Sequence, residues 1–334
     1  MFDWLDSGNM ILNLIVLIAG FVALIKGADI FVDGSSGIAR KFGVPGVIIG
    51  LTVVAMGTSA PELAVSVSAG IAGSNEIAVS NVIGSNLFNL LVVLGVCALI
   101  KPLPVDHGIK KRDYPICLIA TLLLLFYAST RVVFSSPRPS LSDSRAIAGE
   151  ITRIGGLVLL IGFVLYILYT IRVAKKKATR DETSSNEPVL KNILLIVIGL
   201  AMIVVGGDGV VESAKNLALM WGMSETLVGL TIVAIGTSLP ELVTSIVASV
   251  KGENGMALGN AVGSNIFNLL LILGCSSVIN PIPVTVASFF DIGVLLLVTI
   301  GAYFFVCSGR LLERYEGAIM VAAYVGYTVY AIMR

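Results

Sequence analysis

Two glutamates in apolar surroundings are the residues of this sequence best placed to do chemistry. Glu62 and Glu241 each lie near the middle of a long apolar stretch, in the motifs GTSAPE and GTSLPE. If those stretches cross a bilayer, each charge costs roughly 2 to 4 kcal/mol unless it is compensated. Structural hydrogen bonds are one possible compensation and a bound cation is another. Because the motif occurs twice, we favour the cation.

A proline directly precedes each glutamate. Pro61 has no amide hydrogen for the carbonyl of Gly57, and Pro240 has none for Gly236. Freed carbonyls at bilayer depth are tolerated only where a cavity, a partner or an ion satisfies them. The nearby side chains offer only oxygen donors, from Thr58, Ser59, Glu62, Thr237, Ser238 and Glu241. Such donors suit hard cations, and two carboxylates facing each other across a two-fold axis would neutralise one Ca²⁺.

A second duplicated motif adds neutral ligands. It reads NVIGSNLFNLL and NAVGSNIFNLL, and its serine and asparagine lie four residues apart on one helix face, as Ser85 with Asn89 and Ser264 with Asn268. Amide and hydroxyl oxygens would complete a coordination shell without adding charge. Close helix packing is the alternative, and for the serines the two explanations are equally good. Asn86 and Asn265 lie a quarter turn away, and we expect them to position the helices.

Further acids recur at the same offset of 179 residues. Asp29 matches Asp208, and Asp33 matches Glu212. We place Asp29 and Asp33, one turn apart, at the cytoplasmic end of the first span, and Asp208 and Glu212 at the outer end of the sixth. Our hypothesis is that they line the mouths of two ion passageways; ordinary helix-end acids are an equally good explanation.

Composition excludes several classes of protein. Of 334 residues, 56% are hydrophobic and 13% are charged, whereas soluble domains carry about a quarter charged residues. The net charge of +1 gives no footprint for nucleic acid. The four cysteines are scattered and His107 lies in a polar connection, so a disulfide scaffold, a thiolate zinc site and an HExxH centre are excluded. Without a nucleophile–base pair or a phosphate-binding loop, we predict no enzyme, no cofactor and no obligate protein partner.

Hydropathy predicts ten membrane-spanning helices. The beginning MFDWLDSGNM has no basic residue ahead of its apolar run, so we expect no cleavable signal peptide. The expected spans are 10–32, 44–70, 76–100, 114–134, 148–171, 191–214, 224–250, 254–279, 286–308 and 316–333.

The basic residues predict the orientation of these spans. With both termini outside, 15 of the 22 lysines and arginines face the cytoplasm, and one loop, 131–147, dissents. The mixed-charge segment Lys175 to Pro188 is then cytoplasmic, and we interpret it as a plain linker between two halves. We expect an integral protein of a prokaryotic plasma membrane, in contact with lipid.

An internal repeat organises the whole chain. Between 44–105 and 223–284, 30 of 62 positions are identical without a gap. Each half holds five spans, an odd number, so the second copy enters the bilayer from the opposite side, as in secondary transporters. The predicted fold is all-α and polytopic, with ten transmembrane helices in two inverted five-helix repeats and broken helices in the core. We divide it into 1–172, a linker 173–190 and 191–334, with the repeated motifs at 50–95 and 229–274.

The duplicated motifs resemble the two alpha repeats of the cation/calcium exchanger superfamily, and within it the prokaryotic sodium/calcium antiporters. The resemblance covers about 60 residues in each half, and in span number it extends over the chain. It implies an ion cluster built by Glu62, Glu241, Asn89 and Asn268. It also implies flanking sodium sites formed by Thr58, Ser59, Ser85, Thr237, Ser238 and Ser264, with the backbone carbonyls of Ala55 and Ala234.

The resemblance further implies Na⁺/Ca²⁺ antiport by alternating access. Both copies end in asparagine where potassium-dependent relatives carry aspartate at position 268, so we expect no potassium requirement. Three Na⁺ for one Ca²⁺, as the family suggests, would move one net charge per cycle. By analogy with the family, the first and sixth helices slide past the core. The short central loop excludes the large regulatory calcium-binding domains of animal exchangers.

Two other functions remain open from the sequence. A Ca²⁺/H⁺ antiporter of the same superfamily would move calcium on a pH gradient without sodium. A cation channel would need no counter-ion, and broken helices also occur in channels.

Overall fold

The computed structural model describes residues 5, 9–73, 75–136, 138–177, 188–223 and 234–333. Within these ranges seven helices are long and apolar enough to cross a membrane, and an eighth candidate is a pair of helices bent by 47°. The seven are Met10–Phe42, Glu76–Ile100, Arg153–Lys176, Val189–Met220, Asn254–Ile279, Val286–Ser308 and Arg314–Met333. The bent pair is Gly46–Thr58 with Ala60–Ile71, and a shorter apolar helix covers Leu239–Val250. The protein is therefore an all-α polytopic membrane protein.

Most expected spans coincide with helices, and three need correction. α1 (Met10–Phe42) runs ten residues beyond its expected end at 32, until Gly43 adopts a left-handed φ of 60°. The span expected from 148 starts later, as α9 (Arg153–Lys177), because β2 (Ile147–Ile151) precedes it.

The fourth expected span, 114–134, is divided at Ser129 into α7 (Tyr114–Ala128) and α8 (Thr130–Phe134). Of the span expected at 224–250, residues 224–233 lie outside the described ranges.

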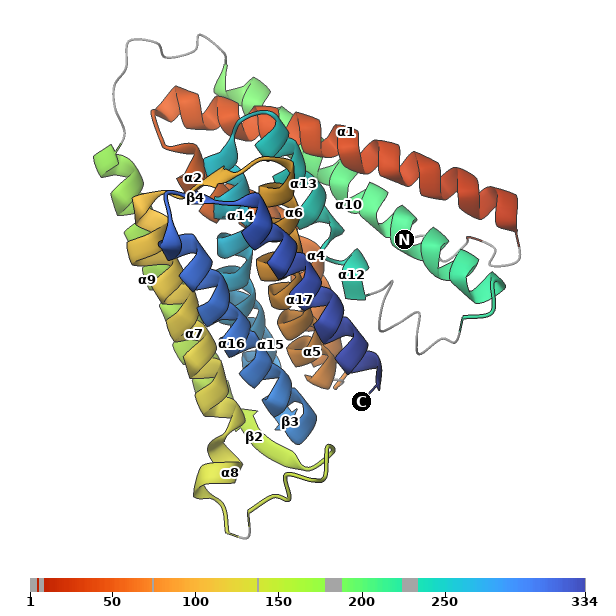
Figure 1. Cartoon of the computed structure of the whole chain (residues 1–334), viewed down its shortest axis with the longest axis vertical. Coiled ribbons are helices and arrows are strands. Elements are labelled where there is room, and N and C mark those ends of the chain that lie inside the picture. Colours follow the sequence, from red (N-terminus) through yellow and green to blue (C-terminus); the bar gives the residue numbers. More distant parts are fainter. Residues whose placement is uncertain are drawn as a thin grey trace.

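Two short strand pairs mark the two ends of the helical bundle. β1 (Leu103–Pro104) pairs with β4 (Leu311–Leu312), and β2 pairs with β3 (Ile282–Thr285), both antiparallel. The end with β1 and β4, where α9 stops before the central linker, is called the linker end below. The end with β2 and β3 is called the far end (Figure 1).

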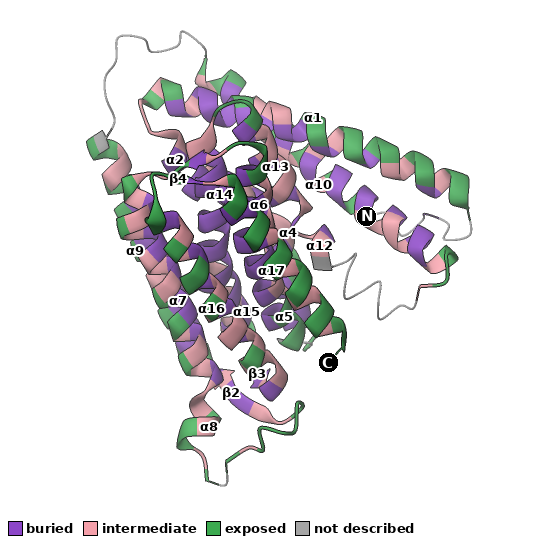
Figure 2. Ribbon diagram, in the orientation of Figure 1, coloured by how far each residue is buried: buried purple, intermediate pink, exposed green. Residues whose placement is uncertain are grey.

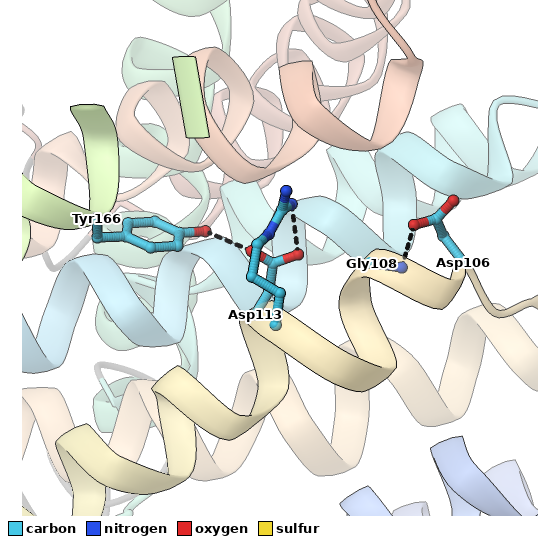
Figure 3. Close-up of polar contacts among 5 residues, drawn as sticks. Asp106, Gly108, Asp113 and Tyr166 are labelled. Atoms are coloured by element: carbon cyan, nitrogen blue, oxygen red, sulfur yellow. Dashed lines mark hydrogen bonds and ion pairs between the residues drawn. The ribbon is translucent and has the colours of Figure 1, made fainter. Parts of the chain in front are cut away.

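The linker end also holds a buried ion pair. The π-helical segment η3 (Ile109–Asp113) leads into α7, and at its end the guanidinium of Arg112 donates to both carboxylate oxygens of Asp113 at 2.7 Å. The Tyr166 hydroxyl donates to Asp113 at 3.4 Å (Figure 3). The pair fixes the start of α7 against α9.

The core consists of two long, interrupted helices. The first is α5 (Asn75–Phe88), η2 (Asn89–Val93) and α6 (Leu94–Ile100). The second is α14 (Asn254–Phe267), η5 (Asn268–Ile272) and α15 (Leu273–Ile279). In these two, 72% and 78% of the most apolar window is buried, against 17% to 28% in the other five long helices. Figure 2 shows the same buried centre and exposed periphery. The outer helices, among them α16 (Val286–Ser308) and α17 (Arg314–Met333), therefore present apolar side chains to lipid.

α1 and α10 (Val189–Met220) lie side by side and cross the bundle obliquely (Figure 1). Their contact is lined with glycines. A Cβ added at Gly27 would come within 2.8 Å of the Gly199 carbonyl, and one at Gly206 within 2.7 Å of the Gly20 carbonyl. These glycines are mates at the 179-residue offset, so the repeats meet here through one interface used twice.

Candidate cation site

Each glutamate motif begins a helix at a break in the chain. Ser59 separates α3 (Ala55–Thr58) from α4 (Ala60–Ile71), and Ser238 precedes α13 (Leu239–Val250) in the same way. Proline is accepted at the first positions of a helix, where its missing N–H would have no partner. Both glutamates consequently fall in the first turn of a new helix, where the positive end of the helix dipole favours a carboxylate.

Crossed hydrogen bonds join the two motifs. Ser59 Oγ donates to Glu241 Oε1 at 2.8 Å, and Ser238 Oγ donates to Glu62 Oε1 at 3.2 Å. The two glutamates are 1% and 0% exposed, and they are close enough to interact coulombically. Oε2 of each has no hydrogen-bond partner, and among the described residues no Lys, Arg or His pairs with either. The structure thus brings together two buried carboxylates with no protein cation beside them.

Neutral polar atoms without partners lie on the core helices that pack against the two glutamate motifs. The hydroxyl of Ser85 is close enough to Glu62, and that of Ser264 to Glu241, to interact electrostatically with the carboxylate. Neither hydroxyl, however, has a partner with the geometry of a hydrogen bond. Both side-chain polar atoms of Asn89 are unpartnered, as is Oδ1 of Asn268. Buried polar atoms nearly always have partners, so this group of orphans matches the donor set of a hard cation.

Two of these ligand candidates begin a π-helical turn. η2 starts at Asn89 and η5 at Asn268, so the distortion occurs at the same point of both repeats. Single π turns inside α-helices frequently lie at functional sites, because they redirect a side chain and alter the backbone hydrogen-bond pattern. The described part of the chain contains no cluster of three or more His, Cys, Asp and Glu, so the fixed charge available here comes from the two glutamates.

The remaining asparagines of the second motif connect the core helices. Asn265 Nδ2 donates to the backbone carbonyl of Asn86 at 3.4 Å, and Asn268 Nδ2 donates to Asn86 Oδ1 at 3.0 Å. This confirms the expected helix-positioning role of Asn86 and Asn265. The second bond also leaves Oδ1 of Asn268 as the atom of that side chain free to act as a ligand.

The sequence analysis missed two positioning residues, Asn81 and Asn260. Asn260 Nδ2 donates to Ser245 Oγ at 3.0 Å and to the Glu241 carbonyl at 3.4 Å. Asn81 Nδ2 makes the same bonds, at the same distances, to Ser66 and to the Glu62 carbonyl. Their recurrence at the 179-residue offset was the available signal. Each fixes the first turn of the helix that carries a glutamate.

The two halves differ around their threonines. The Thr58 hydroxyl donates to the Val54 carbonyl and approaches Asn260 Oδ1, both at 3.2 Å, whereas the Thr237 hydroxyl has no partner among the described residues. The Ser59 amide donates to the Ala55 carbonyl, four residues back, whereas that of Ser238 donates to Ile235, three residues back. The Ala55 carbonyl is thus already bonded within the chain, and an ion bound there would share that carbonyl with the Ser59 amide.

A cavity of about 200 Å³ adjoins the second break, next to Thr237. Its lining includes Thr237, Pro61, Pro240, Asp208 and Glu212, from α4, α10 and the second break. Asp208 and Glu212 thus line a cavity, and their role at the mouth of an ion passageway stays a prediction. Their mates, Asp29 and Asp33, lie inside α1 rather than at its end, because the helix continues to Phe42. Both are bonded to Lys251.

Comparison with known proteins identifies the family. The family model for sodium/calcium exchanger proteins matches residues 12–172 and 191–333. The putative antiporter CaxA of Alkalimonas amylolytica is 37% identical over 330 residues, covering 95% of this chain and 98% of that protein. The sodium/calcium exchanger MaX1 of Methanosarcina acetivorans is 35% identical over 341 residues, covering 95% and 97%.

The fold agrees with that of a solved exchanger. A structure of the sodium-calcium exchanger NCX_Mj, soaked with 10 mM Na⁺ and no Ca²⁺, superimposes with a TM-score of 0.81 at 31% identity, covering 95% of this chain and 98% of that one. The buried carboxylate pair, the inverted repeat and these likenesses all support one assignment: the chain belongs to the sodium/calcium exchanger family.

Proposed function

We propose that this protein exchanges Na⁺ for Ca²⁺ across a membrane by alternating access. One observation carries the proposal: Glu62 and Glu241 meet buried inside the helical bundle, each bonded to the serine of the other motif and each with one unpartnered oxygen. Two carboxylates balance one Ca²⁺. The orphaned oxygens of Asn89, Asn268, Ser85 and Ser264 would complete its coordination.

Sodium would use the flanking oxygens. We assign these sites to the hydroxyls of Thr58, Ser59, Thr237 and Ser238, with the carbonyls of Ala55 and Ala234. The free hydroxyl of Thr237, at the cavity, makes the site on that side ready for an ion. On the closed side, Thr58 would have to exchange its present hydrogen bonds for an ion.

The charge of the site explains why exchange is obligatory. An empty site would carry two unpaired negative charges through an occluded state, at a cost of several kcal/mol for each ion. One Ca²⁺ makes the cluster neutral, and two or three Na⁺ make it neutral or singly positive. Either load lowers the barrier, so the return step requires an ion.

Two finer properties follow from the same ligand set. With asparagine at both 89 and 268, two fixed charges are present instead of three, which supports exchange without potassium. A ratio of three Na⁺ to one Ca²⁺ would move one charge per cycle and add about 2.3 kcal/mol per 100 mV to the driving force. With both termini outside and the 173–190 linker in the cytoplasm, the cavity at Thr237 opens outward.

Calcium uptake into sodium-loaded proteoliposomes tests this function. We expect uptake that needs the sodium gradient, ignores a protonophore and external potassium, and is accompanied by an outward current, because three Na⁺ leave the vesicle for each Ca²⁺ that enters. The Glu62→Gln variant in the same vesicles is the control and should show none. Uptake driven by a pH gradient without sodium would instead identify a Ca²⁺/H⁺ antiporter, and flux without a counter-ion would identify a channel.

A further inference from the structure

A single lysine ties the oblique helix α1 to the core at the linker end. Lys251 follows α13 directly, and its ammonium contacts Asp29 Oδ1 at 2.8 Å, Asp33 Oδ1 at 2.6 Å and the Asp29 carbonyl at 2.9 Å. An ammonium has three N–H donors, so α1 engages all of them. The residue that closes this contact therefore belongs to the helix that carries Glu241.

The contact is charged and partly shielded. Burial lowers the pKa of Lys251, but the hydrogen bonds that its ammonium donates to Asp29 and Asp33 outweigh that effect and raise the pKa, so the side chain stays protonated. A second ion pair, from Arg40 to Glu253 at 3.7 Å, joins the same two parts of the chain, but its arginine is 60% exposed. Exposed pairs contribute little singly, whereas one ammonium shared by two carboxylates forms a small network.

The mirror position lacks the lysine. At the 179-residue offset, Asp29 and Asp33 become Asp208 and Glu212, but Lys251 becomes Ala72. The segment 60–80, which covers α4 and the turn after it, contains no lysine or arginine. Glu212 pairs instead with Lys215 of its own helix, at 3.1 Å. The acids are thus duplicated while the cation that binds them is present at one end only.

The far end, which lacks the lysine, has a cavity, whereas the linker end, which has Lys251, is closed at the equivalent position. The far-end cavity, between α4 and α10, is lined by Val65, which is 41% exposed. Its mate at the linker end is Thr244, which is fully buried with an unpartnered hydroxyl. The same passage, related by the inverted repeat, is therefore open where the lysine is missing and closed where it is present.

We propose that Lys251 is a one-sided latch: by holding Asp29 and Asp33 it keeps the linker-end passage shut and biases the exchanger toward the conformation open at the far end. This rests on the alternating-access function proposed above. Opening the linker end requires α1 to move away from α13, and that movement must break all three bonds of the ammonium. The equilibrium between the two conformations is consequently unequal, although the repeats that form them are alike.

Two cysteine reporters test the latch without measuring transport. In protein whose four native cysteines are replaced by serine, Val65→Cys reports the far-end passage and Thr244→Cys the linker-end passage. Reaction rates with a water-soluble maleimide are measured in detergent. With Lys251→Met, we expect Thr244→Cys to react about 2 to 10 times faster and Val65→Cys to react more slowly, as a shifted equilibrium requires. Lys251→Arg, which keeps the charge, should leave both rates near their starting values.

Moving the latch gives an independent test. Ala72→Lys places an ammonium opposite Asp208 and Glu212, so it should shift both reporters in the same sense as Lys251→Met, and the double variant should shift them most. Unchanged rates in both variants, or rates that rise together, would overturn the proposal, because a joint rise means general loosening. Shifted rates in protein that exchanges no calcium would retain the latch and reject the proposed function.

Discussion

The segments 57–66 and 236–245 share the sequence GTSxPEL and a serine four residues after the glutamate, yet they lie in different surroundings. In the first, the Thr58 hydroxyl is hydrogen-bonded to the Val54 carbonyl and to Asn260 Oδ1. In the second, the Thr237 hydroxyl is free and adjoins a cavity. One motif thus occupies two states within a single molecule. If access alternates as proposed, each half would pass between these two states during transport.

Neutralising either glutamate tests whether the two halves contribute equally to calcium binding. We expect Glu62→Gln and Glu241→Gln each to reduce sodium-driven calcium flux by about 100-fold or more, because either change removes half the charge that balances Ca²⁺. Flux into proteoliposomes is the measurement. Glu316→Gln, a buried acid that bonds Ser308 and the amide of Glu313 away from the site, is the matched control and should keep exchange. A large loss in one glutamine variant alone would show that the carboxylates are not equivalent.

Crowding the glycine interface tests whether α1 and α10 act as one unit. A Cβ at Gly27 or at its mate Gly206 would lie 2.7 Å from atoms of the opposite helix. We expect Gly27→Ala and Gly206→Ala each to lower stability by about 1 to 3 kcal/mol, as overpacking does, and to slow exchange in parallel. Thermal unfolding in detergent and initial flux give both values. Gly301→Ala, where no atom lies within 4 Å, should change neither; unequal effects of the first two would break the symmetry of the pair.

The asparagine pair sharpens the difference between the halves. Asn260 is 1% exposed and its Oδ1 also faces Thr58, whereas Asn81 is half-buried. Asn260→Ala should therefore cost more stability than Asn81→Ala, by about 1 kcal/mol, because it leaves more buried polar groups without a partner. Unfolding curves of the two variants decide this. Equal losses would mean that the closed side is no better packed than the open one.

Acidifying the medium slightly should change the exchange rate less than any of the substitutions above. Protons compete with Ca²⁺ for the carboxylates of Glu62 and Glu241, and a protonated carboxyl is a poor ligand, so exchange should fall as the pH is lowered. The initial rate at saturating sodium, followed from pH 8 to pH 5.5, checks the direction. Because protons and Ca²⁺ compete for the same two carboxylates, one from each half, raising the calcium concentration should restore the rate. Transport that rises steadily on acidification would contradict this explanation.

Hydropathy and duplication carried most of what the sequence could predict. Apolar stretches and a repeat with an odd number of spans indicated an inverted membrane fold, and two identical motifs indicated a shared site. Neither signal distinguishes the copies from one another. The sealed state of Thr58 and the open state of Thr237 depend on contacts between distant segments, such as Lys251 with Asp29, and a local motif does not encode these.

Local apolarity also misplaced two boundaries. Residues 148–151 are apolar enough to extend a helix, but they pair with Ile282–Thr285 as a strand. The stretch 114–134 contains no proline after Pro115 and no glycine, yet the helix ends at Ala128. The Ser129 and Thr130 hydroxyls bond backbone carbonyls three residues back, an alternative to helix continuation that a hydropathy window does not detect.

The strand pairs at the two ends have a mechanical consequence. In each pair, one strand comes from the first repeat and the other from the second. Backbone hydrogen bonds therefore join the two halves at both the linker end and the far end. Neither strand pair includes a residue of α1 or α10. We therefore expect the core helices to stay together and the transport movement to occur in α1 and α10, which side chains such as Lys251 connect to the core.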